Sequence, residues 1–142
     1  MREKLNLLLY HSGSILSLLL IEWGFFYLTI FLRFFELPDY VHPNAFSYIF
    51  MVDALVLLPA SLIRTLRSNH RITYLLICAL IPFAVCYLFA FATLFPTDVE
   101  SELALKIGNF YSIWTGILGL ISGIIMLRCD KMLLPRYRKY FG

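Results

Sequence analysis

The sequence predicts an all-α protein, a single bundle of four transmembrane helices over residues 1–142. Three observations predict this class. Of the 142 residues, 61% are hydrophobic and 15% are charged, whereas a soluble domain has about 25% charged residues. The stretches 72–97 and 107–127 contain no charged residue, and each reaches the ~20 residues that an α-helix needs to cross a bilayer. Short segments rich in turn-forming residues separate the apolar stretches.

The first transmembrane helix is expected at about 14–32. Arg2 and Lys4 precede it, as basic residues precede the apolar region of a signal peptide. The apolar stretch is longer than such a region, however, and no small-residue cleavage site follows it. We therefore expect this helix to be retained in the protein.

Three further helices are expected at about 45–63, 72–95 and 108–127. The connections between them are short, so consecutive helices should be antiparallel neighbours. Before the last helix, Thr97 and Glu100 have the spacing of a capping box, in which each side chain accepts a hydrogen bond from the other residue's backbone amide. This motif predicts a short helix over 98–107, which would extend the fourth helix outward.

Basic residues are distributed unequally between the two sides of the predicted bundle. One side carries ten of them: Arg2, Lys4, Arg64, Arg67, Arg71, Arg128, Lys131, Arg136, Arg138 and Lys139. The other side carries two, Arg33 and Lys106, together with five acids. Because Lys and Arg stay on the cytoplasmic side of short loops, both termini and the 64–71 loop are expected in the cytoplasm.

The C-terminal tail alternates basic and aromatic residues. Its charges are Arg136, Arg138 and Lys139, and Tyr137, Tyr140 and Phe141 lie among them. Such a segment suits the surface of an anionic leaflet, where each basic residue contributes about 1 kcal/mol. Anchoring to the lipid bilayer is the simplest interpretation, and docking to a partner is the alternative.

Two acids lie inside predicted transmembrane helices. Glu22 is near the middle of the first and Asp53 near the middle of the second. Because these helices are antiparallel neighbours, the two carboxyl groups are expected at about the same depth. A charge there costs at least ~2.5–3.5 kcal/mol, so such residues usually face a bundle interior.

Three roles for these acids follow from the physical chemistry. In the first, one or both acids are neutral and hydrogen-bonded to Tyr87 or Thr115. In the second, they bind a proton or cation in transport. In the third, they pair with a basic residue of another protein.

Pro59 in the second helix and Pro82 in the third leave the carbonyls of Leu55 and Cys78 without their helical donors. A kink is expected at each proline. Because the Leu55 carbonyl lies two residues from Asp53, a polar pocket at that depth is the alternative.

The fourth predicted helix carries small residues at four-residue spacing, in two rows. The rows are Gly108, Ser112 and Gly116, and Thr115, Gly119 and Gly123. Small residues allow two helix backbones to approach closely. Packing within the bundle is one use of these rows, and contact with another chain is the other.

Several function classes find no support. The three cysteines and three histidines lack metal-ligand spacing, since His11, His42 and His70 each fall in a different loop or tail. The loops are too short for a catalytic site, and no basic soluble face is available for nucleic acid. We therefore expect no enzyme activity, no metal, no cofactor and no nucleic-acid partner.

Two families share features with this chain. The acid in the first helix and the small residues of the fourth resemble the small multidrug resistance transporters, in which that acid exchanges protons for a cationic drug. This resemblance implies a transport role for Glu22 alone, because Asp53 and the strong charge bias depart from that family.

The chain also resembles the uncharacterised enterobacterial inner-membrane proteins of the YbjO-like group. The residues concerned are Arg71 and Tyr74, the loop with Pro96, Glu100 and Ser101, and the basic-aromatic tail. This resemblance implies a bacterial inner membrane.

The leading functional hypothesis is an accessory protein that recognises another membrane protein, or a second copy of itself, through the fourth helix and the two acids. The alternative is a small proton- or cation-coupled transporter that uses Glu22 and Asp53.

Overall fold

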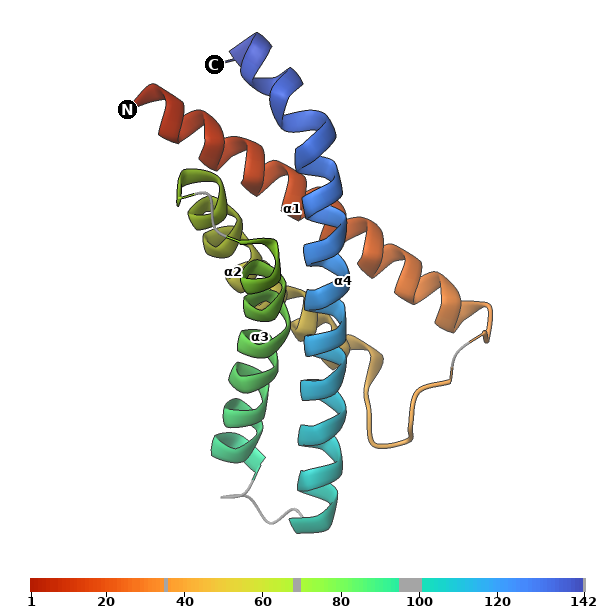
Figure 1. Ribbon diagram of the computed structural model, residues 1–142. Coiled ribbons are helices and arrows are strands. Elements are labelled where there is room, and N and C mark those ends of the chain that lie inside the picture. Colours follow the sequence, from red (N-terminus) through yellow and green to blue (C-terminus); the bar gives the residue numbers. More distant parts are fainter. Residues whose placement is uncertain (35, 68–69, 95–100, 142) are drawn as a thin grey trace.

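The chain forms four long helices (Figure 1). The structure, a computed structural model, describes residues 1–34, 36–67, 70–94 and 101–141. The helices are α1 (Arg2–Phe31), α2 (Pro43–Arg67), α3 (Arg71–Leu94) and α4 (Ser101–Phe141), and the described residues contain no strand. The predicted all-α, four-helix fold is therefore confirmed.

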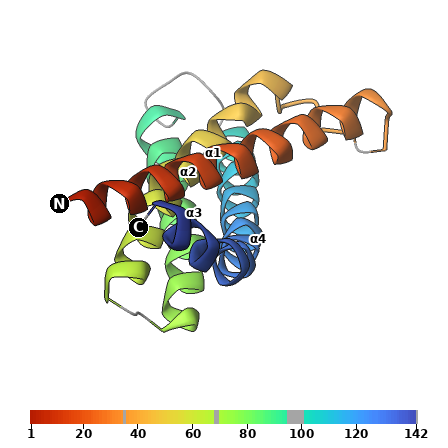
Figure 2. The same cartoon turned by 90° about the horizontal axis from the view of Figure 1, so that it is seen from above.

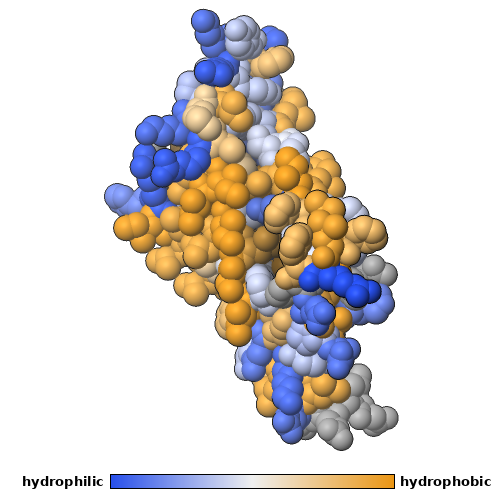
Figure 3. Space-filling view, turned by 90° about the vertical axis from the view of Figure 1, so that its right-hand side faces the viewer, coloured by the Kyte–Doolittle hydropathy of each residue, from blue (hydrophilic) through white to orange (hydrophobic). Residues whose placement is uncertain are grey.

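All four helices are long and apolar enough to cross a membrane. Large apolar side chains cover the outside of the bundle, and Figure 3 shows them as a broad belt between more hydrophilic ends. Such a belt matches the hydrocarbon core of a bilayer. The chain is therefore a multi-pass membrane protein.

The helices pack unequally. Helices α3 and α4 contact each other more extensively than any other pair, whereas α1 contacts the rest of the bundle least, through α2 and α4. Figures 1 and 2 show α1 lying obliquely across the other helices, and both termini lie at one end of the molecule. The end of α2 and the start of α3 lie toward the same end, as alternating antiparallel helices require (Figure 1).

Helices α1 and α4 are longer than the apolar stretches within them. Helix α1 begins at Arg2, and α4 continues through the basic tail to Phe141. These two ends pack together through Leu7, Tyr10 and Leu134. Hydropathy detects the part of a helix that lies in lipid, and this tertiary contact stabilises the remaining turns as helix.

Helix α1 ends in a Schellman motif, in which residues beyond the helix cap its last carbonyls. The amides of Arg33 and Phe34 donate to the carbonyls of Ile30 and Thr29, both at 3.0 Å. Arg33 adopts φ 58°, a left-handed conformation that usually belongs to glycine. The chain can therefore turn sharply out of α1 without a glycine.

The close approach of α3 and α4 depends on glycines of α4. A Cβ atom on Gly108 would lie 3.1 Å from the Ala90 Cβ, and one on Gly116 would lie 3.2 Å from the Ala79 carbonyl oxygen. One on Gly123 would lie 3.2 Å from the Cys78 Cβ. These glycines of α4 therefore face α3 inside the bundle.

Candidate functional site: two buried polar clusters

The two intramembrane acids meet the same face of α4. Glu22, half-buried on α1, accepts hydrogen bonds from Ser122, whose Oγ lies 2.9 and 3.1 Å from its two carboxyl oxygens. Asp53 on α2 is fully buried, and its Oδ1 lies 2.9 Å from where a Cβ on Gly119 would be. Gly119 and Ser122 are three residues apart, so they share a helix face. We name Glu22, Asp53, Gly119 and Ser122 the mid-depth cluster.

Asp53 has no hydrogen-bond partner among the described residues. Both of its carboxyl oxygens are buried and unpaired. The carbonyl oxygen of Cys78 also fills the space that a Cβ on Gly119 would need. This carbonyl lacks its helical hydrogen bond, because the residue four positions further on is Pro82, which has no amide hydrogen. An unpaired acid and a carbonyl oxygen without its helical donor therefore meet at one glycine.

The mid-depth cluster has no basic partner in the part of the chain that the structure describes. Within the described residues, the ion pairs are Arg64–Asp130 and Glu102–Lys106, and neither involves Glu22 or Asp53. Because an unpaired charge in an apolar interior costs several kcal/mol, this arrangement suits carboxyl groups that hold a proton. A neutral Asp53 can donate one hydrogen bond, and the Cys78 carbonyl can accept it.

The hydrogen-bond donor to Glu22 is neither of the two residues that the sequence led us to expect. Thr115 donates to the Tyr111 carbonyl at 2.6 Å and lies 3.2 Å from the Cys86 Sγ. The Tyr87 ring instead stacks on Phe83, with centroids 6.0 Å apart. Ser122 was overlooked because it lies outside both small-residue rows, one residue before Gly123.

Ser112, the remaining polar member of the small-residue rows, is fully buried, and its hydroxyl is unpaired within the described part of the chain. It therefore places a polar group that lacks a described partner in the interior of the bundle, on the α4 turn before Gly116.

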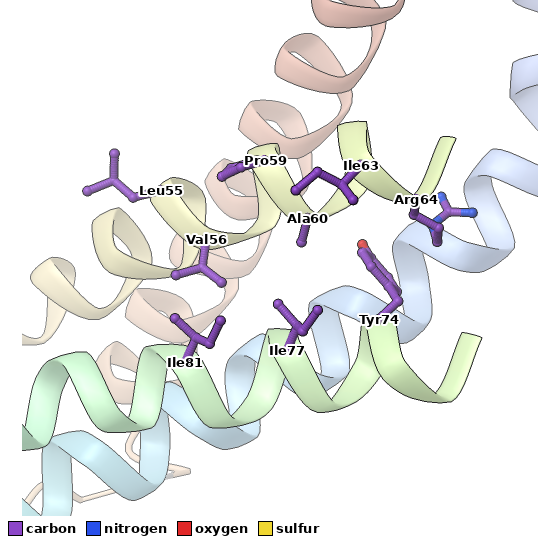
Figure 4. A pocket seen from close by; sticks show the side chains of 9 residues that line it. All are labelled: Leu55, Val56, Pro59, Ala60, Ile63, Arg64, Tyr74, Ile77 and Ile81. Atoms are coloured by element: carbon purple, nitrogen blue, oxygen red, sulfur yellow. The ribbon is translucent and has the colours of Figure 1, made fainter. Parts of the chain in front are cut away.

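A second polar cluster, which sequence reasoning missed, lies toward the end that carries the termini. Arg64 on α2 forms an ion pair with Asp130 on α4, and Tyr10 on α1 donates to the Asp130 Oδ1 at 3.0 Å. The Arg64 guanidinium lies 4.9 Å from the centre of the Tyr74 ring on α3. Figure 4 shows the Arg64 side chain beside Tyr74 at the end of the α2–α3 groove. All four helices meet here, and we name these residues, with His11, Ser61 and Thr65, the terminus-end cluster.

His11 belongs to this cluster, which corrects its expected place in a tail. It is fully buried on α1, and its Nε2 lies 2.7 Å from the Thr65 Oγ1. The hydroxyls of Ser61 and Tyr74 are 2.9 Å apart. Two signals were available: Asp130 is the only acid between Arg128 and Lys139, and Tyr10 and His11 continue a helical face shared with Leu7 and Ile15.

Two apolar grooves lie beside these clusters. One, of about 290 Å³, runs between α2 and α3 from Leu55 to Arg64 (Figure 4). The other, of about 410 Å³, lies between α2, α3 and α4 around Tyr48 and Phe89. Neither groove is lined by Glu22 or Asp53.

The other predicted sites are placed as follows. Arg136, Arg138 and Lys139 are exposed on the last turns of α4, while the capping box of Thr97 and Glu100 lies outside the described residues. Cys78, Cys86 and Cys129 are free thiols. Among the described residues, no three His, Cys, Asp or Glu side chains are arranged to hold a metal ion.

Comparison of the chain with protein-family models, curated protein sequences and solved structures gives no match. The two resemblances stated from the sequence remain predictions.

Proposed function

We propose that this protein is an accessory protein of a bacterial inner membrane, with both termini cytoplasmic, and that it binds another membrane protein along α1. The observation that carries this proposal is Glu22, a half-buried carboxyl group within a membrane-spanning helix. The Ser122 hydroxyl donates to it, whereas a carboxyl group has room for several hydrogen bonds. A partner helix with a donor or a basic side chain at this depth would satisfy it.

The packing of α1 also supports a partner contact on this helix. Helix α1 has fewer contacts with the bundle than α4 has, and it exposes large apolar side chains such as Leu20, Ile21 and Phe25. The glycines of α4, in contrast, face α3. We therefore assign the partner contact to α1 rather than to α4.

Site-specific photo-crosslinking in native membranes tests this assignment. A photoreactive residue at Ile21 should crosslink to one membrane protein, and Glu22→Gln should lower the yield because it removes the acid and changes the hydrogen bonds. The matched control is Leu88 on α3, which is 68% exposed against 70% for Ile21. Equal protein adducts at both positions, or none at Ile21, would refute the proposal.

A small proton-coupled transporter is the second candidate, favoured by one observation, the unpaired Asp53 beside the Cys78 carbonyl. Proteoliposomes containing the purified chain and a pH-sensitive dye test it. This hypothesis expects proton flux that Asp53→Asn abolishes while the chain stays folded. Flux equal to that of empty liposomes would exclude it.

A further inference from the structure

The two ends of the chain enclose a hollow that the proposed function does not use. The Asn6 side chain on α1 donates to the Phe141 carbonyl at the end of α4. Beside this contact lies a hollow of about 650 Å³. It is lined by Arg2, Glu3, Asn6, Arg138, Tyr140 and Phe141. Figures 1 and 2 both show the last turns of α4 leaning toward the start of α1.

The charge of this hollow favours an anion. Arg2 and Arg138 contribute two positive charges and Glu3 one negative charge, so the lining carries a net charge of +1. Lys4, Arg136 and Lys139 are exposed on the same two helix ends. Arginine binds phosphate oxygens through two parallel hydrogen bonds, and a phosphodiester carries a single negative charge.

The remaining lining indicates a ligand at the membrane surface. Tyr140 is 76% exposed and Phe141 61% exposed at the end of a membrane-spanning helix. Aromatic side chains favour the level of the lipid headgroups. The first amides of α1 also point toward this end without a side-chain cap, and a helix N-terminus favours negative charge.

We propose that the hollow between the first turns of α1 and the last turns of α4 binds the phosphate of an anionic phospholipid, with Arg2 and Arg138 as its ligands. Asn6 joins the two walls, and Tyr140 and Phe141 contact the glycerol and upper acyl region. The lipid thereby holds the two chain ends together at the membrane surface. This inference is independent of the partner surface on α1.

Native mass spectrometry of the purified full chain, titrated with phosphatidylglycerol or phosphatidylcholine, tests the proposal. We expect one phosphatidylglycerol per chain to bind on the order of tenfold more tightly than phosphatidylcholine. In the double variant Arg2→Gln/Arg138→Gln this preference should disappear. Inorganic phosphate should not displace the lipid, because it lacks the glycerol and acyl groups that the aromatic residues contact.

The matched control is Arg67→Gln/Arg71→Gln, which removes two exposed charges from the same end of the bundle but not from the hollow. It should keep the phosphatidylglycerol preference within about twofold. An equal loss in both double variants would show diffuse charge attraction and overturn the proposal. So would the absence of any preference in the unmodified chain, or displacement by inorganic phosphate. Thermal melting should be alike for all three proteins, since the substituted side chains are exposed.

Discussion

Asp53 and Asp130 are both buried in this bundle, and the structure provides them with opposite surroundings. Asp130, 5% exposed, has the Arg64 guanidinium and the Tyr10 hydroxyl as partners. Asp53, which is fully buried, has a glycine and a carbonyl oxygen without its helical donor beside it, and no basic residue among those described. A buried carboxylate is stable when it is paired, and a buried neutral acid needs only a hydrogen-bond acceptor. We therefore expect Asp130 to be ionised and to link the helices through its ion pair. Asp53 is expected to be protonated.

The largest effect is expected from Arg64→Gln. This change leaves Asp130 buried without its cation, and breaking one side of a buried ion pair costs about 3–5 kcal/mol. Denaturant unfolding in mild detergent measures the free energy of unfolding. Arg67→Gln, at an exposed position one turn further on, is the control and should change it by less than about 0.5 kcal/mol. Equal values for the two variants would show that the ion pair does not stabilise the fold.

Tyr10→Phe tests the other partner of Asp130. It removes a hydrogen bond to a charged group, which is worth about 1.5–3 kcal/mol, and leaves the ring contacts with His11 and Tyr137 in place. The same unfolding measurement applies, with Tyr48→Phe at a 67% exposed position as the control. No loss of stability in Tyr10→Phe would mean that α1 is not joined to Asp130.

Gly119→Ala tests the space beside Asp53. The added methyl group would collide with the Cys78 carbonyl and meet the Asp53 Oδ1, and overpacking of this kind costs about 1–3 kcal/mol. A Cβ on Gly24 of α1 would meet no described atom within 4 Å beyond its own helix backbone and chain neighbours, so Gly24→Ala should instead stabilise its helix by about 0.5–1 kcal/mol. Destabilisation of similar size by both changes would contradict the close approach of α3 and α4.

The smallest effect is expected from Asp53→Asn. Asparagine has the shape of a neutral aspartic acid and can donate the same hydrogen bond, so the loss should stay below about 1 kcal/mol. Asp130→Asn, which removes a charge from an ion pair, should cost more. Infrared spectra sharpen the contrast: the carbonyl band of protonated carboxylic acids should be smaller in Asp53→Asn and unchanged in Asp130→Asn. A spectrum without that band in the unmodified chain would refute a neutral Asp53.

The sequence was sufficient for the four-helix class. The uncharged stretches 72–97 and 107–127 predict membrane helices because each residue's preference for lipid or water is its own property. Antiparallel packing of the first two helices also predicts Glu22 and Asp53 at about the same depth, and in the structure the two acids meet α4 at Ser122 and Gly119. The glycine spacing of α4 likewise predicted close packing, although not the helix that it would contact.

The tertiary structure alone decided which polar groups meet. Ser122 is 100 positions from Glu22, Arg64 is 66 positions from Asp130, and Tyr10 is 120 positions from it. Hydropathy and helical period describe neighbours along one helix, whereas these contacts depend on how α1 crosses the bundle and how α4 is rotated. The polar ends of α1 and α4 were therefore predicted as tails. They are helical in the structure because folding brings them together, and each packs its apolar side chains against the other.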